Sequence, residues 1–97
     1  MKIITICGSL KFKNEMMKVA EKLALEGNCI ITPVYPTEEK YTRTDEQIEN
    51  LKKAHFKKID LSDAIYIVNV NNYIGESTKL EIEYAKSKNK EIIYLEN

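Results

Sequence analysis

Four short apolar runs stand out along the chain, each bounded by polar or turn-forming residues. They cover Ile3–Cys7, Cys29–Thr32, Ala64–Val70 and Glu91–Leu95. The runs are rich in β-branched residues and are continuous rather than alternating, which is typical of strands in a parallel sheet that is covered on both faces. We therefore predict four parallel strands.

Three segments with apolar residues at helical spacing separate these runs. The first covers about Lys13–Glu26, the second opens at a Thr44/Gln47 capping box and ends near Lys58, and the third covers about Lys79–Lys88. Strands alternating with helices, joined by right-handed crossovers, favour the sheet order 2-1-3-4. The 97 residues thus predict one single-domain α/β protein with a flavodoxin- or Rossmann-like three-layer fold, made of a four-stranded parallel sheet and three helices.

The charge balance and the amino-terminal run narrow the set of partners. Fifteen Lys and Arg residues against fifteen Asp and Glu residues give zero net charge, which argues against a nucleic acid polymer as partner. The first apolar run is too short to span a membrane and lacks the features of a signal peptide. We therefore expect a cytoplasmic protein without a membrane partner.

The two cysteines give no sign of a metal or a disulfide. Cys7 and Cys29 lie inside apolar runs without a C-x-x-C spacing, which indicates small buried hydrophobes in a reducing compartment. No group of His, Cys and carboxylate residues has ligand spacing along the chain, so the sequence predicts no metal and no cofactor.

A ligand site is expected at the carboxyl ends of the strands, where open α/β sheets bind their ligands. The segment 8–11, the loop after Pro33 and the segment 69–78 should share this rim. Candidate contacts there are Gly8, Ser9, Leu10, Lys11, Tyr35, Asn69, Tyr73, Gly75, Ser77 and Thr78. Gly8, Ser9 and Lys11 before a helix suit a phosphate, and they also suit an ordinary turn and cap. Residues 33–43 form either a lid over the ligand or a connector.

Two interpretations of Glu81 fit its spacing. Thr78 and Glu81 match a capping box at the start of the third helix. Alternatively, Glu81 lies one turn into that helix and faces the rim, as a carboxylate that attacks or stabilises an electron-poor carbon.

His55 and Asp63 are two further titratable residues near the predicted site, and the second predicted helix also carries four lysines. His55, on the apolar stripe of the second helix, is either a buried imidazole or a catalyst. Asp63 precedes the third strand, where a carboxylate often accepts backbone hydrogen bonds. The lysines of the second helix are expected to form a solvated face; they are Lys52, Lys53, Lys57 and Lys58.

Several motifs resemble nucleoside 2-deoxyribosyltransferases and 2'-deoxynucleoside 5'-monophosphate N-glycosidases over almost the whole chain. They are Cys7–Lys11, Ser62-Asp63 and Thr78-x-x-Glu81-x-x-x-Ala85. The segments His55–Asp63 and Tyr73–Thr78 look most similar to a group of small bacterial proteins of unassigned activity in that superfamily.

The resemblance implies roles for these residues. Glu81 matches the helix glutamate that attacks the sugar C1' in characterised members, and Ser9, Lys11 and Ser77 would hold the 5'-phosphate. The family's acid on the second helix is replaced here by His55, and a family glycine by Glu83. His55 would then protonate the leaving base as imidazolium, with Tyr35, Tyr73 or Asp63 to orient it.

The predicted function is therefore cleavage or transfer of the N-glycosidic bond of a (deoxy)nucleoside 5'-monophosphate. The alternative is a non-catalytic binder that senses or sequesters a nucleotide-derived ligand, which the missing acid would explain; a scaffold with a vestigial site is a third possibility. Because so short a chain can hardly enclose a nucleotide, and a neighbouring subunit completes the site in the family, we expect a homodimer or larger homo-oligomer.

Overall fold

The computed structural model describes residues 1–38 and 42–97, and within them four strands alternate with three α-helices. The elements are β1 (Ile3–Cys7), α1 (Lys13–Leu25), β2 (Cys29–Ile31), α2 (Asp45–Asp60), β3 (Ala64–Ile67), α3 (Glu76–Ser87) and β4 (Glu91–Tyr94), with short 3-10 helices η1 (Leu10–Phe12) and η2 (Val70–Asn72). All neighbouring strands pair in parallel, in the order β2-β1-β3-β4. The predicted sheet order is confirmed.

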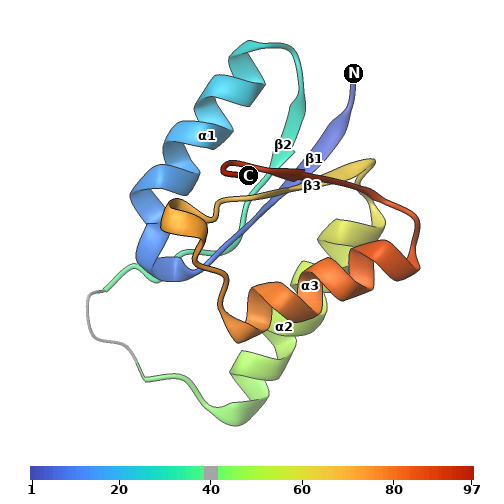
Figure 1. Ribbon diagram of the computed structural model, residues 1–97. Helices are drawn as coiled ribbons and strands as arrows, with labels where there is room; N and C mark the ends of the chain where they lie inside the picture. Colours follow the sequence, from blue (N-terminus) through green and yellow to red (C-terminus); the bar gives the residue numbers. More distant parts are fainter. Residues whose placement is uncertain (39–41) are drawn as a thin grey trace.

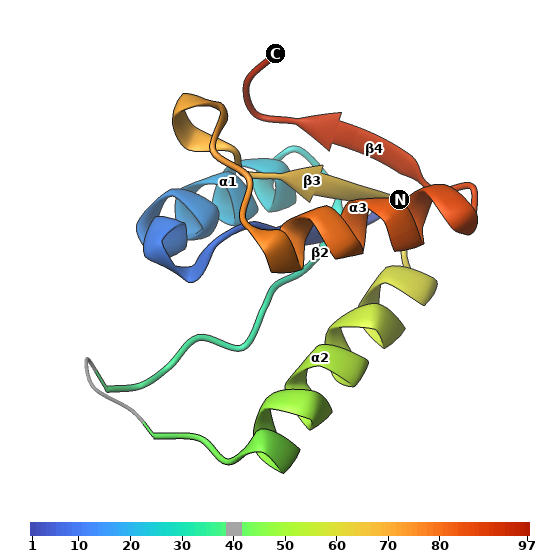
Figure 2. The ribbon, with the colours of Figure 1, turned by 60° about the horizontal axis from the view of Figure 1, so that its bottom comes forward.

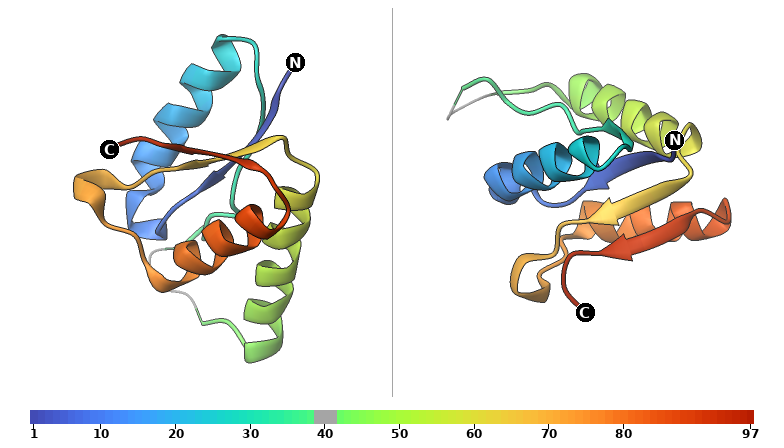
Figure 3. Two further views of the ribbon diagram at one scale, coloured as in Figure 1. Left: turned by 45° about the vertical axis from the view of Figure 1, so that its right-hand side comes forward. Right: turned by 90° about the horizontal axis from the view of Figure 1, so that it is seen from above.

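The sheet separates two layers of helices (Figures 1 and 3). On one side α1 packs on a cluster built around Ile6, Met16 and Val68. On the other side α2 and α3 cover a second cluster, formed by Cys7, Ile59, Ile65, Ile67, Ile82 and Ala85. Consecutive strand residues point to opposite faces, so Ile6 and Cys7 belong to different clusters. The predicted three-layer α/β architecture is therefore confirmed.

Helices α2 and α3 lie side by side on the same face of the sheet (Figure 2). The rings of Phe56 and Tyr84 pack with their centroids 4.7 Å apart, and the Tyr84 hydroxyl donates a 2.6 Å hydrogen bond to Asp60 Oδ1. These contacts fix the carboxyl-terminal half of α2 against α3.

Two of the predicted helix ends are observed. The Thr44 hydroxyl accepts from Gln47 N at 3.1 Å, and Gln47 Oε1 accepts from Thr44 N at 2.9 Å, which is the capping box that opens α2. Gly27, just after α1, has a φ of +102°, a conformation that favours glycine.

The third strand and the third helix differ from their predicted bounds. β3 ends at Ile67 because the chain turns into η2, where Asn71 and Asn72 adopt left-handed conformations. α3 begins at Glu76, with Gly75 as a cap that makes no side-chain hydrogen bond. Thr78 is therefore a buried residue inside the helix, and the predicted Thr78/Glu81 capping box is wrong.

The cysteine prediction holds for one residue only. Cys7 is fully buried in the sheet, whereas Cys29 is exposed because it begins the edge strand β2. In the described part of the chain, no helix has the length and apolar character needed to cross a lipid bilayer.

Candidate active site

A pocket of about 610 Å³ opens at the carboxyl ends of the strands. Four segments line it: the exit of β1 (Gly8, Ser9, Leu10), the chain after β2 (Pro33, Val34, Arg43), one face of α2 (Ile48, Leu51, Lys52, His55, Lys58) and the start of α3 (Gly75, Glu76, Ser77, Thr78, Glu81). Its volume falls in the range of sites for small organic ligands.

Three side chains from three different elements come together beside this pocket, and we call them the trio; Cys7 and His55 are buried and Glu81 is partly buried. Cys7 ends β1, His55 lies on α2 and Glu81 lies in the second turn of α3. His55 Nε2 is 3.3 Å from Cys7 Sγ and 3.6 Å from Glu81 Oε1. The side chains of His55 and Glu81 are only 11% and 17% exposed. The spacing along the chain gave no sign of this cluster, which forms only in three dimensions.

Burial controls the protonation of the trio. It raises the pKa of Glu81 from 4.5 to about 7, partly offset by a hydrogen bond from Cys7, and it lowers the pKa of His55 from 6.5 to about 4, with a further contribution from the Lys58 charge. It also raises the pKa of the Cys7 thiol, an effect strengthened by Glu81. The lowered pKa of His55 favours the neutral imidazole at neutral pH despite its carboxylate neighbour, which argues against the imidazolium predicted to protonate the base.

Glu81 is the acidic member of the inward face of α3. Thr78, Ile82 and Ala85 are the buried residues of this helix, and Glu81 lies among them at helical spacing. The first backbone N–H groups of α3, at Glu76 to Thr78, have no partners within the helix and carry its positive dipole end to the pocket wall. The start of α3 therefore combines an anion-attracting end with a partly desolvated carboxylate.

The loop after β1 contributes Gly8 and Ser9 to the pocket. A Cβ on Gly8 would lie 3.2 Å from both Met16 Sδ and Val68 O, so close packing explains the glycine. The Ser9 hydroxyl accepts from Lys11 N at 3.4 Å and caps η1. The turn-and-cap interpretation is therefore observed here, with Ser9 still at the pocket wall.

Lys11 and Tyr73 do not line the pocket. Lys11 Nζ instead lies 3.4 Å from the centroid of the Tyr73 ring, which in turn meets Phe12 edge-on at 5.9 Å. In this structure the ammonium group predicted to bind phosphate therefore lies over the Tyr73 ring, outside the pocket.

Three other predicted site residues also have contacts outside the pocket. Asp63 precedes β3 at the amino ends of the strands, where its Oδ2 accepts from Ile3 N at 2.8 Å, so it is not brought to Glu81 or His55. The side-chain amide of Asn69 bonds the backbone N and O of Glu96, both at 2.9 Å. Tyr35 packs in the cluster under α1.

Of the four α2 lysines predicted to form a solvated face, Lys52, Lys53 and Lys57 are exposed and Lys58 is half-buried. Lys52 and Lys58 also line the pocket, as does Arg43 from the loop before α2. Lys52 and Lys58 flank His55 at three residues on either side, so helical spacing already placed them on its face. Lys58 Nζ also donates to Thr32 O at 2.9 Å. Sequence reasoning therefore missed most of the positive charge of the site.

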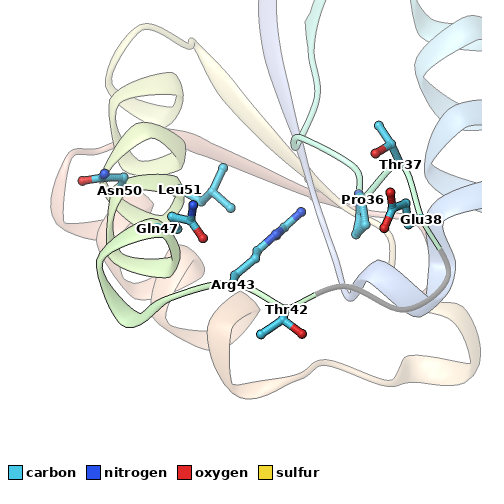
Figure 4. Close-up of a pocket in the computed structure, with 8 residues that line it drawn as sticks. All are labelled: Pro36, Thr37, Glu38, Thr42, Arg43, Gln47, Asn50 and Leu51. Atoms are coloured by element: carbon cyan, nitrogen blue, oxygen red, sulfur yellow. The ribbon is translucent and has the colours of Figure 1, made fainter.

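A second pocket of about 470 Å³ adjoins the first and shares Arg43 and Leu51 with it. Figure 4 shows Arg43 extending between α2 and the segment that carries Pro36, Thr37 and Glu38. Part of the loop predicted as a lid or connector, residues 39–41, lies outside the described residues. The described part of this loop faces α2 across the second pocket.

Comparison with known proteins gives a structural match. No protein-family model and no curated protein sequence matches the chain. The structure is similar to that of a 2-desoxiribosyltransferase from Leishmania mexicana, with a TM-score of 0.70 and 19% identity, over 97% of this chain and 63% of that one. The chain thus spans less than two thirds of the matched protein. At this identity the similarity establishes the fold: this chain has the α/β architecture of a 2-deoxyribosyltransferase.

Proposed function

We propose that the chain is an enzyme that cleaves or transfers the N-glycosidic bond of a (deoxy)nucleoside 5'-monophosphate, with Glu81 as nucleophile. One observation carries this proposal: Glu81 is a largely buried carboxylate in the wall of a ligand-sized pocket. The competing helix-capping role does not apply, because α3 begins at Glu76. A desolvated carboxylate beside a ligand pocket suits covalent catalysis.

The reaction follows from the chemistry of an anomeric carbon. An Oε of Glu81 forms a bond to C1' while the C1'–N bond breaks and the base leaves with the electron pair, taking up a proton. Water or an acceptor base then attacks C1', and the bond to Glu81 breaks. In hydrolysis the oxygen of that water becomes the C1' hydroxyl; the proton that the water or the acceptor base releases on attack balances the one that the leaving base took up.

The phosphate would lie against the start of α3 in this proposal. The Ser77 hydroxyl, the Ser9 hydroxyl and the free N–H groups of the first helical turn are donors on the pocket wall. Lys52 supplies the positive charge in place of Lys11, whose ammonium stacks on Tyr73. Lys52 on α2, and not Lys11 in the loop after β1, is thus the proposed cation of the phosphate site.

We also propose that residues 1–97 form one domain of this type and that copies of it associate. Ile48 lines the pocket while remaining 51% exposed, and a second copy would cover this apolar surface. A cytoplasmic location stays a prediction.

The second candidate function is a binder of a nucleotide-derived ligand without turnover. The neutral state of His55 favours it, because departure of a base is assisted by a proton donor, and simple binding requires none.

The decisive experiment compares two glutamates of α3. Wild-type protein is incubated with deoxynucleoside 5'-monophosphates and the matching nucleosides, free base is quantified by chromatography, and binding is followed by thermal shift. Glu81→Gln should reduce base release by at least about 1000-fold and keep the thermal shift, because an amide is not a nucleophile. The control Glu83→Gln removes an exposed carboxylate that pairs with Lys86 at 3.5 Å, and it should release base at the wild-type rate.

The other outcomes are equally informative. Wild-type rates in Glu81→Gln would contradict the nucleophile assignment. Ligand binding without base release in the wild type would favour the binder, and the absence of both would favour a vestigial site.

A further inference from the structure

We infer that Cys7, His55 and Glu81 form a binding site for Zn²⁺, and that loading this site withdraws Glu81 from attack on the sugar. The binding rests on the geometry of the trio alone, whereas the inhibition rests also on the proposed function. The two parts are tested by separate measurements.

The donor set selects the class of ion. A thiolate, an imidazole and a carboxylate are the three kinds of side chain that bind zinc in proteins. Magnesium and calcium prefer sites made of oxygen atoms, which this cluster does not offer. The chemistry of the trio therefore points to a borderline-soft divalent cation.

The distances fit a single ion between the three side chains. In a tetrahedral zinc site with bonds of about 2.3 Å to sulfur and about 2.1 Å to nitrogen and oxygen, neighbouring ligand atoms lie roughly 3.4–3.6 Å apart. The measured separations are 3.3 Å from Cys7 Sγ to His55 Nε2 and 3.6 Å from His55 Nε2 to Glu81 Oε1. One ligand atom from each residue lies within 4.8 Å of the others.

The backbone holds the trio in this arrangement. Each member belongs to a regular element, and the contacts of Phe56 and Asp60 with Tyr84 join α2 to α3 beside it. His55 and Glu81 also line the pocket, so a fourth coordination position would face the pocket. A structural zinc site is closed by four protein ligands, whereas a site with three protein ligands keeps one position for an exchangeable ligand. The trio would be a site of the second kind.

Metal binding and glycosyl transfer exclude each other at this position. On binding, the Cys7 thiol releases its proton to the solvent and the sulfur becomes a thiolate ligand. The Glu81 carboxylate then donates its electron pair to the ion and is no longer a free nucleophile for C1'. We therefore expect Zn²⁺ to be an inhibitor that a chelator reverses.

Cobalt provides a spectroscopic test that does not depend on activity. Metal-free full-length protein is titrated with Co²⁺, and the sulfur-to-cobalt charge-transfer band in the near ultraviolet is recorded. One Co²⁺ per chain should bind with this band, and Zn²⁺ should displace it while Mg²⁺ and Ca²⁺ do not. Cys7→Ser should abolish the band and weaken binding at least about 100-fold, and the control Cys29→Ser, at an exposed cysteine, should leave both unchanged.

The same titration contains the results that would overturn the site. They are a wild-type complex without a charge-transfer band, or a band that survives in Cys7→Ser and vanishes in Cys29→Ser. Should Cys7→Ser fail to fold, Glu81→Gln replaces it, with the band retained and the affinity reduced.

Base release then tests the inhibition. Saturating Zn²⁺ should stop release by the wild type, and EDTA should restore it; release that persists with the site loaded would overturn the inhibitory role. If the wild type releases no base at all, the proposed function fails, while the cobalt spectrum still decides the metal site.

Discussion

The two faces of the sheet differ in what they bury. Under α1 the central residues are the apolar Ile6, Met16 and Val68, each 1% exposed or less. The other face, covered by α2 and α3, contains four buried polar residues, each 9% exposed or less. Thr5 comes from β1, His55 from α2, Ser62 from the turn after α2 and Thr78 from α3. Buried polar groups lower stability unless they are paired. The apolar face under α1 therefore mainly stabilises the fold, whereas the face under α2 and α3 carries the candidate site.

The polar face itself contains two kinds of environment. The Thr5 and Ser62 hydroxyls lie 2.6 Å apart, and each is also within hydrogen-bond distance of Lys58 O, at 3.2 and 2.8 Å. Their two protons make two of these three bonds at a time, so each hydroxyl has a partner and the end of α2 is held on β1. The carboxylate of the trio, by contrast, has a pKa shifted by burial, which is typical of functional groups.

The largest effect on stability is expected on the α1 face. Ile6→Ala should lower the free energy of unfolding by about 2–5 kcal/mol, because it leaves a cavity in the cluster under α1. Denaturant unfolding measures the loss, and Ile6→Val should show about 0.5–1.5 kcal/mol. Any base release by the folded fraction should stay unchanged. A loss of activity without a loss of stability would contradict the conclusion that the α1 face serves stability and not the candidate site.

On the polar face a substitution should stabilise the protein in a pH-dependent way. The pKa of Glu81 is raised in the fold from 4.5 to about 7, so the contribution of Glu81 to wild-type stability is full below pH 4.5 and is lost as the pH rises through 7. Glu81→Gln carries no charge and avoids this loss. With EDTA present, it should exceed the wild type by roughly 2–3 kcal/mol above pH 7 and match it near pH 4.

Thermal unfolding between pH 4 and pH 9 checks this prediction, with Glu83→Gln as the exposed control. A constant difference between Glu81→Gln and wild type across the range would show that burial does not penalise the Glu81 charge.

The smallest effect concerns a polar group on the apolar face. The Tyr35 hydroxyl is buried and has no hydrogen-bond partner among residues 1–38 and 42–97. Tyr35→Phe removes it, so unfolding free energy should stay equal or rise by up to about 1 kcal/mol, with base release unchanged. Loss of activity in this variant would instead support the predicted role of Tyr35 in orienting His55.

The sheet could be predicted from the sequence because the information was local. Continuous β-branched runs such as Ile3–Cys7 and the Thr44/Gln47 capping box are short-range signals, and right-handed crossovers then determine the strand order. The start of α3 could not be predicted in this way, since Gly75 caps it without a side-chain hydrogen bond. The spacing of Thr78 and Glu81 matches a capping box, but Thr78 lies inside the helix and not at its start.

The site was predicted only in part because it depends on three-dimensional convergence. Cys7, His55 and Glu81 are far apart in sequence and meet only when α2 and α3 are packed on β1. The topology alone would have excluded Asp63 from the predicted site, since a residue just before β3 lies at the amino ends of the strands. Helical spacing from His55 would have identified Lys52 and Lys58.

The position of β1 inside the sheet has a consequence for the order of folding. β1 pairs with β3 in a register that places Ile4 opposite Ala64, and such long-range pairing closes a large loop and forms late. The trio spans β1, α2 and α3, with Cys7 and His55 separated by 48 residues, so it exists only after this closure. A nucleotide or a metal ion that recognises the trio should therefore slow unfolding of the chain and leave its folding rate unchanged.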